Sequence, residues 1–186
     1  IFMPGDGAAD PSGVTHMLAK AARIEGTQIF EHSPVQEILT KNGKILGVKV
    51  NGVEIESEYI VLASGMWSRQ IGKKAGVSIP LYPAEHFYII TEPIENLSNK
   101  LPVIRDFDNR TYIKEDAGKI LVGIFEGKSI PAFNKTNIVP DDFSFGEFPE
   151  NLEHFEPYLN SALKRFPVLK TAGIRKFFSG PESFTP

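Results

Sequence analysis

The sequence lacks cysteine altogether and has a single tryptophan in 186 residues. Without cysteine the chain has no disulfide, no thiolate nucleophile and no cysteine-based metal site, which fits an intracellular setting. Positive charge is also scarce, since 20 Lys and Arg stand against 23 Asp and Glu, and the net charge of −3 predicts no nucleic-acid partner. Apolar runs stay well short of the roughly 18 residues that cross a membrane, so we expect no membrane association.

Common catalytic signatures are missing as well. None of the four histidines is spaced from another as metal ligands are, and no Ser/His/Asp arrangement is indicated. The phosphate-binding pattern Gly-x-Gly-x-x-Gly is absent, because Gly5 and Gly7 lack a preceding strand and a third glycine. What is present is the composition of a globular protein, 41% hydrophobic and 23% charged. The chain begins without an initiator methionine and ends inside Ser-Phe-Thr-Pro, so we expect a fragment of a longer protein.

Residues 59–67, Tyr-Ile-Val-Leu-Ala-Ser-Gly-Met-Trp, are the most informative stretch. A short apolar run that ends in Ala-Ser-Gly suits a buried strand better than a helix. Ligands of open α/β sheets collect beyond the carboxyl ends of such strands, and Gly65 would let a ligand approach the backbone. The alternative is an ordinary strand-to-helix turn.

The chain before this stretch predicts a helix, a short strand and a β-meander. Asp10 and Pro11 are typical of an N-cap and a first helical residue, and apolar residues follow at helical spacing as far as residue 25. Residues 27–30 indicate a short strand, so that helix and strand would be half of a βαβ unit. Asn-Gly favours tight hairpins because both residues tolerate positive φ. Two such pairs, at 42–43 and 51–52, separate the predicted strands 35–41, 44–50 and 53–55.

The second half predicts further strands and one long helix. Alternation along residues 85–92 places His86 and Tyr88 on one face and Phe87 on the other. The spacing of Leu and Phe predicts a helix over 149–166, although Pro157 is expected to break or kink it. The remaining predictions are a short helix at 68–76, an extended crossing at 77–83, strands at 110–115, 119–125 and 173–178, irregular chain at 131–149 and a turn at 179–183.

Four motifs, taken in order, resemble one family. They are Pro34-Val35, Ala-Ser-Gly-Met-Trp at 63–67, Glu-His-Phe-Tyr-Ile-Ile-Thr-Glu at 85–92 and Gly-Pro-Glu-Ser-Phe-Thr-Pro at 180–186. Together with the meander they are similar to the flavoprotein part of dimethylglycine and sarcosine dehydrogenases, in the D-amino-acid-oxidase-type superfamily of FAD-dependent oxidoreductases. The resemblance covers residues 6–186.

This resemblance implies an α/β fold and a domain order. Residues 1–77 would be part of an FAD-binding βαβ domain with the meander inserted, and residues 78–178 a mixed-sheet α+β substrate domain. Residues 179–186 would return to the FAD-binding domain. The main phosphate-binding loop and any covalent attachment site for FAD would lie outside the fragment.

The resemblance also implies roles for individual residues. Tyr88 matches a tyrosine on the substrate side of the flavin, and His86 lies near it in sequence, so both are candidate catalytic residues. No metal site is implied. The candidate contacts to FAD are Val35, Ser64, Gly65, Met66, Trp67, Gly180, Pro181, Glu182 and Ser183.

The chemistry of amine oxidation agrees with these assignments. The substrate needs a neutral amine whose C–H hydride reaches the flavin, so the protein must orient and desolvate it. The Tyr88 phenol can hydrogen-bond the substrate, and His86 can adjust protonation near neutral pH. Arg105, Arg110 and Lys114 are candidates for binding a substrate carboxylate.

The expected function is therefore oxidation of an N-methylated glycine, of dimethylglycine or sarcosine type, by hydride transfer to FAD. Two alternatives stay open, namely a flavoenzyme for another amino acid or secondary amine such as proline, and a non-catalytic α+β interaction domain. The partners implied for the whole enzyme are a small-molecule amine substrate and folate or an electron-acceptor protein. The implied location is the cytoplasm or the mitochondrial matrix.

Overall fold

The computed structural model describes residues 1–185 and divides into two compact units. One unit comprises Ile1–Ser64 with Gln70–Ile79, and the other comprises Gly65–Arg69 with Pro80–Pro186. Each unit is described by itself, and the domain boundaries predicted from the sequence stay predictions. No helix within residues 1–185 is long and apolar enough to cross a membrane.

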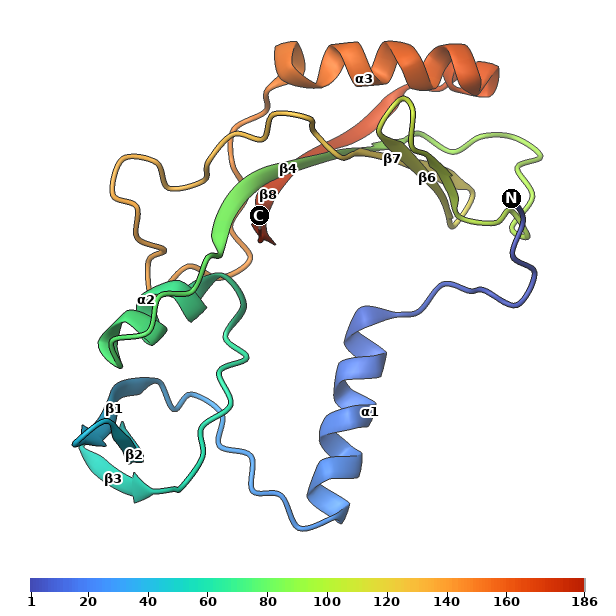
Figure 1. The fold of residues 1–186 in the computed structure, drawn as a ribbon. Helices are drawn as coiled ribbons and strands as arrows, with labels where there is room; N and C mark the ends of the chain where they lie inside the picture. The colour runs from blue at the N-terminus through green and yellow to red at the C-terminus, as the bar shows by residue number, and fades with distance from the viewer. Residues whose placement is uncertain (186) are drawn as a thin grey trace. The chain divides into compact units, whose positions relative to one another are not determined.

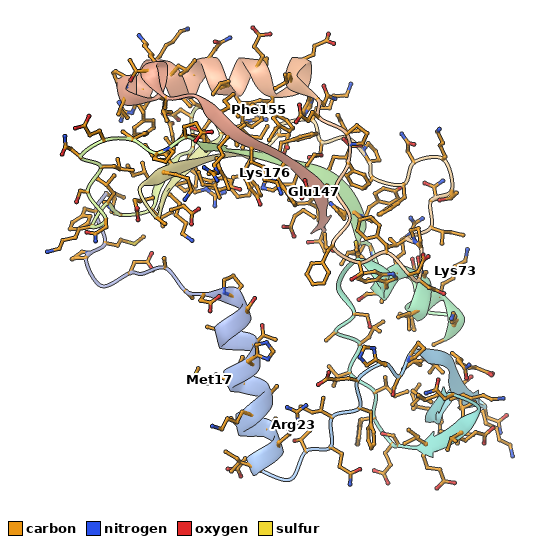
Figure 2. The ribbon with its side chains drawn as sticks, turned by 180° about the vertical axis from the view of Figure 1, so that it is seen from behind. Met17, Arg23, Lys73, Glu147, Phe155 and Lys176 are labelled. Carbon is orange, nitrogen blue, oxygen red and sulfur yellow. The ribbon has the colours of Figure 1, made fainter. Side chains whose placement is uncertain are left out.

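The first unit begins with helix α1, Pro11–Ile24, as predicted. The Asp10 side chain accepts hydrogen bonds from the backbone N–H groups of Ser12 and Gly13, so the predicted N-cap is confirmed. The helix buries none of its residues, and Met17, labelled in Figure 2, is 62% exposed. The capping residues and helical spacing therefore define α1 without help from a core.

The β-meander is confirmed as a three-stranded antiparallel sheet in the order β1-β2-β3. Its strands are β1 (Val35–Lys41), β2 (Lys44–Val50) and β3 (Val53–Glu56). Both Asn-Gly pairs have positive φ at each residue, with 52° and 74° at the first turn and 49° and 81° at the second. These are the backbone angles that a type I′ hairpin turn requires.

Two predicted strands of this unit are wrong. Residues 27–30 and 59–63 are not part of any sheet among residues 1–185, and Tyr59 and Val61 are 83% and 90% exposed. A strand is stabilised by pairing with a neighbour, and neither segment pairs with another strand within the described residues. The parallel βαβ strands expected from these runs are therefore not formed in residues 1–185.

After this segment the chain turns into two short helical elements. The 3-10 helix η1, Gly65–Trp67, leads directly into α2, Ser68–Lys74. Gly65 has a φ of +52°, a left-handed conformation that glycine adopts without strain. The predicted small-residue turn followed by a short helix is thus confirmed, with the helix ending two residues earlier than expected.

The second unit is built on a five-stranded sheet in the order β5-β6-β7-β4-β8, shown in Figure 1. All pairings among its described strands are antiparallel, which corrects the expectation of a mixed sheet. Short connections join β5 to β6 and β6 to β7, and such connections favour antiparallel pairing. The strands are β4 (Tyr82–Thr91), β5 (Ile104–Asp106), β6 (Thr111–Asp116), β7 (Lys119–Ile124) and β8 (Ile174–Phe184).

Strand β8 is longer than the sequence indicated. The segment 179–183, predicted as a turn, continues the strand because it pairs along β4, with Gly180 opposite His86 and Ser183 opposite Pro83. In Figure 1 the two long strands lie side by side through most of their length. Pairing with β4 therefore overrides the turn propensity of Gly-Pro. The short strand β5 was not predicted from the sequence.

The core lies between this sheet and helix α3, Leu152–Arg165, which covers one face in Figure 1. Phe87 and Phe155 are fully buried there, and the predicted separation of Phe87 from His86 and Tyr88 on β4 is confirmed. The helix runs through Pro157 without a break, against expectation. Buried residues on both sides of the proline, Phe155 and Ala162, hold both halves against the sheet.

Candidate active site

A row of side chains crosses the sheet of the second unit on the face opposite α3. Side chains alternate along each strand, so this face carries the residues next to the buried ones. The pairing register places five residues opposite one another in turn: Arg105 on β5, Tyr112 on β6, Gly123 on β7, Tyr88 on β4 and Phe178 on β8.

Gly123 makes room in this row for an aromatic ring. A Cβ at this position would collide with the Cζ and Oη atoms of Tyr112, so the Tyr112 ring lies directly over the glycine. On the other side the Tyr88 ring stacks on Phe178, with centroids 4.4 Å apart and planes inclined by 17°. Two phenols therefore sit next to each other on the same sheet face.

His86 completes the polar centre of this face. It lies two residues before Tyr88, and its Nε2 is 3.1 Å from the Tyr112 hydroxyl oxygen. The ring is enclosed by Phe125 and Phe184, at centroid distances of 5.6 and 6.4 Å, and its side chain is only 13% exposed. Burial raises the pKa of Tyr112 to about 12, so its hydroxyl carries its proton at neutral pH.

Tyr88 is more open and stands among charges. Partial burial raises the pKa of Tyr88, while the nearby Lys176 ammonium opposes that rise. Lys176 donates a hydrogen bond of 2.7 Å to Glu147, a pair visible in Figure 2, and its ammonium lies 5.6 Å from the centre of the Phe178 ring. The predicted partners His86 and Tyr88 thus share one face, and the structure adds Tyr112 between them.

A cavity that contains two arginines adjoins the same face at its β5 edge. Its volume is about 220 Å³, and its lining residues are Arg105, Asp106, Phe107, Arg110, Phe125 and Glu126. The Arg105 guanidinium lies 4.0 Å from the centre of the Phe125 ring and 5.0 Å from that of Phe107, so two aromatic faces hold it in place. No carboxylate within residues 1–185 forms an ion pair with either arginine. Lys114, the third predicted cation, lies on β6.

The predicted FAD contacts divide between the two units. Gly180, Pro181, Glu182 and Ser183 lie on β8, where Gly180 is opposite His86. Gly65, Met66 and Trp67 form η1, which contacts β8, and the Trp67 indole N–H donates to the Pro140 carbonyl oxygen at 3.0 Å. Val35 and Ser64 belong to the other unit. The assignment of these residues to FAD stays a prediction.

The site suits a flat aromatic group such as a flavin ring. Its face presents flat aromatic side chains, because the Tyr112 ring lies over Gly123 and the Phe178 ring lies beside Gly180. His86, Tyr88 and Tyr112 supply polar groups beside these flat surfaces, as ligand sites with few polar residues in an apolar lining do. The residues present therefore fit the group that the resemblance implies.

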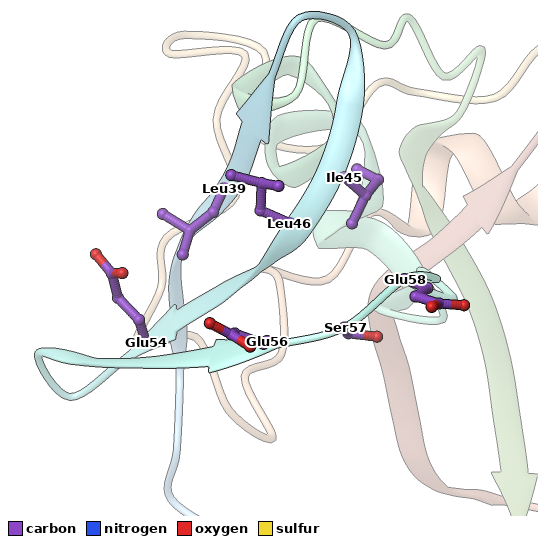
Figure 3. Close-up of a pocket in the computed structure, with 7 residues that line it drawn as sticks. All are labelled: Leu39, Ile45, Leu46, Glu54, Glu56, Ser57 and Glu58. Carbon is purple, nitrogen blue, oxygen red and sulfur yellow. The ribbon is translucent and has the colours of Figure 1, made fainter.

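A second cavity, in the first unit, is lined by none of the candidate catalytic or FAD-binding residues. It has a volume of about 510 Å³ and lies beside the meander, as Figure 3 shows. Three glutamates are among its lining residues, yet no cluster of metal-binding side chains is found in residues 1–185. The lining residues are Leu39, Ile45, Leu46, Glu54, Glu56, Ser57 and Glu58.

Comparison with known proteins defines the class of this chain. Residues 1–186 match the model of the family described as FAD dependent oxidoreductase, so the chain belongs to that family. Its members depend on FAD, and the resemblance drawn from the four motifs is confirmed. The fold is confirmed too, since the L-proline dehydrogenase of P. horikoshii superimposes with a TM-score of 0.77 at 28% identity, over 98% of this chain and 46% of that one.

Three curated relatives each match the whole chain. The 4-methylaminobutanoate oxidase (formaldehyde-forming) of Paenarthrobacter nicotinovorans is 38% identical, and the chain covers 22% of it. The mitochondrial pyruvate dehydrogenase phosphatase regulatory subunit of Mus musculus is 36% identical, with 21% covered. The mitochondrial sarcosine dehydrogenase of Homo sapiens is 35% identical, with 20% covered. The chain thus spans about a fifth of the length of the curated relatives that it matches.

Sequence reasoning missed two residues of the site, Tyr112 and Glu126. Tyr112 is 26 residues from His86 along the chain, and only the register of β6, β7 and β4 brings them together. The alternation of side chains along 110–115 assigns Tyr112 to one face of its strand, but it does not show that Tyr112 contacts His86. Glu126 lies two residues after the end of β7, where a carboxylate is ordinarily solvated, and nothing in the sequence indicates its burial.

Proposed function

We propose that this chain forms the substrate-facing part of an FAD-dependent enzyme that oxidises an N-methylated glycine, of the sarcosine or dimethylglycine type. The observation that carries the proposal is the His86–Tyr112 hydrogen bond on an open sheet face beside Tyr88. FAD, when bound, supplies the acceptor for the hydride that leaves the substrate carbon. Everything else that the reaction needs is binding, orientation and movement of a proton.

The proton has to leave the amine first, because an ammonium has no lone pair to assist the loss of hydride. Tyr112 is protonated at neutral pH and is hydrogen-bonded to His86 Nε2. Its oxygen can accept a proton from the substrate nitrogen as its own proton passes to His86. Tyr88, two residues along the same face, is placed to hydrogen-bond the substrate from the other side.

The substrate carboxylate is assigned to the cavity at the β5 edge. Arg105 is opposite Tyr112 in the register, so an anion bound there lies beside the phenol. Aromatic contacts restrict the guanidinium, which lowers the entropy lost on binding. Arg110 lines the same cavity, whereas Asp106 is held by Asn109 and lies 4.0 Å from Arg165. An incoming carboxylate would therefore meet two arginines that form no ion pair with another described residue, although Glu126 also lines the cavity.

The test is anaerobic reduction of the flavin in the full-length protein. Sarcosine, dimethylglycine and proline are added one at a time, and loss of the oxidised-flavin absorbance is followed by stopped flow. Rapid bleaching by an N-methylglycine supports the proposal, and Tyr112→Phe should then slow it by about 10²-fold or more. Tyr88→Phe measures the contribution of the second phenol. Bleaching by proline alone would move the substrate to the cyclic secondary amines.

A second candidate function rests on a specific likeness. One relative that matches the whole chain at 36% identity is described as a regulatory subunit. The alternative is accordingly a non-catalytic domain that keeps the fold. Retention of FAD with no bleaching by any amine would favour it. The enzyme proposal also includes folate or an electron-acceptor protein as a partner, and a location in the cytoplasm or mitochondrial matrix. The non-catalytic alternative includes none of these.

A further inference from the structure

The second unit contains a buried carboxylate that the fold leaves without a hydrogen bond. The Glu126 side chain is 0% exposed, and neither of its oxygens has a hydrogen-bond partner within residues 1–185. Burying an unpaired carboxylate is costly, and native structures keep such groups only where something else requires them. The Nδ1 atom of the His86 ring lies 3.5 Å from Glu126 Oε2.

The opposite edge of the same ring contacts Tyr112. His86 Nε2 is 3.1 Å from the Tyr112 hydroxyl, whereas Nδ1 is buried and has no other partner within the described residues. A neutral imidazole carries one proton, and an ionised carboxylate can only accept. With the proton on Nδ1, the ring donates toward Glu126 and leaves Nε2 free to accept from Tyr112. With the proton on Nε2, the unprotonated Nδ1 and the Glu126 carboxylate would both be acceptors and would face each other.

No other cation competes for Glu126. Arg105 and Arg110 line the same cavity of about 220 Å³, yet neither forms an ion pair with Glu126 within 4.0 Å. Arg105 is instead held over the Phe125 ring. Besides Glu126, the charged and titratable groups that face Tyr112 are Tyr88, Glu182 and Arg105.

We infer that Glu126 is a positioning residue that fixes the tautomer of His86. It holds the imidazole proton on Nδ1, so that Nε2 always faces Tyr112 as an acceptor. Under the proposed function, on which this role rests, the substrate N–H bond breaks and a new O–H bond forms at Tyr112. The original Tyr112 proton moves to His86 Nε2, and the resulting imidazolium is stabilised by Glu126. Two protons move in turn, the net result is transfer of one proton from the substrate to His86, and no electron is exchanged.

The test reads the tautomer directly in the full-length flavoprotein. Histidine is labelled with 15N, the His86 signals are assigned from their loss in His86→Gln, and magic-angle-spinning NMR shows which ring nitrogen carries the proton. We expect Nδ1–H in the native protein. Glu126→Leu should move the proton to Nε2, whereas Glu126→Gln keeps an acceptor oxygen and should retain Nδ1–H. Glu95→Gln, an exposed change of the same type, is the matched control.

Kinetics supply the second readout. Glu126→Leu should lower the limiting rate of flavin reduction by about 10²-fold with little change in KM, and Glu126→Gln should recover most of that rate. Flavin absorbance in each variant checks that the variant folds. If Glu126→Leu fails to fold, the position of the proton in the native protein still tests the inference. A proton found on Nε2 in the native protein, or an unchanged tautomer in folded Glu126→Leu, overturns the inference. If the tautomer responds as expected but no amine reduces the flavin, the positioning role stands and the proposed function fails.

Discussion

Replacing Gly123 with alanine tests whether the sheet face is built around the Tyr112 ring. In an ordinary strand, Gly→Ala stabilises a protein by about 0.5–1 kcal/mol, because glycine loses more backbone entropy on folding. Here the new Cβ would collide with the Tyr112 ring. Overpacking of this kind costs about 1–3 kcal/mol, and loss of the His86 hydrogen bond adds about 1 kcal/mol. The net expectation is destabilisation by about 1–3 kcal/mol.

The assay is urea denaturation of the full-length protein, with flavin reduction measured beside it. The clash should disappear when the ring is removed, so in a Tyr112→Ala background Gly123→Ala should stabilise by about 0.5–1 kcal/mol. Gly7→Ala, where a Cβ has nothing within 4 Å, is the control and should change stability by less than about 0.5 kcal/mol. If Gly123→Ala stabilises the native protein and leaves flavin reduction intact, the reasoning about this face is refuted.

Three further predictions concern other parts of the chain. Burial raises the pKa of Tyr112 to about 12, above its unfolded value, so the stability it contributes is fully present below about pH 10 and is lost as the pH rises through 12. In urea melts the native protein should lose up to about 2–3 kcal/mol from this group over that range, and Tyr112→Phe should lose less than the native protein, because only the raised pKa of Tyr88 still contributes. Phe155→Ala should cost about 3–5 kcal/mol because the side chain is fully buried, whereas the exposed Phe145→Ala should stay within about 0.5 kcal/mol by the same measurement. Asp10→Ala removes an N-cap and should lower the hydrogen-exchange protection of the first turn of α1 by about 1 kcal/mol, and unchanged protection would show that the cap is dispensable.

Local signals in the sequence predicted local structure well. The Asn-Gly pairs specify the meander because each turn needs positive φ at two adjacent residues, and both turns have it. The Asp10 cap begins α1 where predicted. Alternation along β4 separated the buried Phe87 from His86 and Tyr88 correctly, because successive side chains of any strand point to opposite faces.

The errors arose where pairing partners decide the outcome. The apolar run at 59–63 has strand character but no strand beside it within the described residues, and it stays extended. The Gly-Pro segment of β8 has turn character but pairs with β4 and becomes strand. Pro157 should interrupt α3, yet packing of Phe155 and Ala162 on the sheet keeps the helix continuous.

What the sequence by itself determined is the family, the elements with strong local signals and the sheet face on which His86 and Tyr88 lie. Only the tertiary structure joined His86 to Tyr112 and buried Glu126 beside it. These residues come from β4, from β6 and from just beyond β7. Their contact depends on the register of three strands, which is set by pairing between distant segments and leaves no mark in the spacing of residues along the chain.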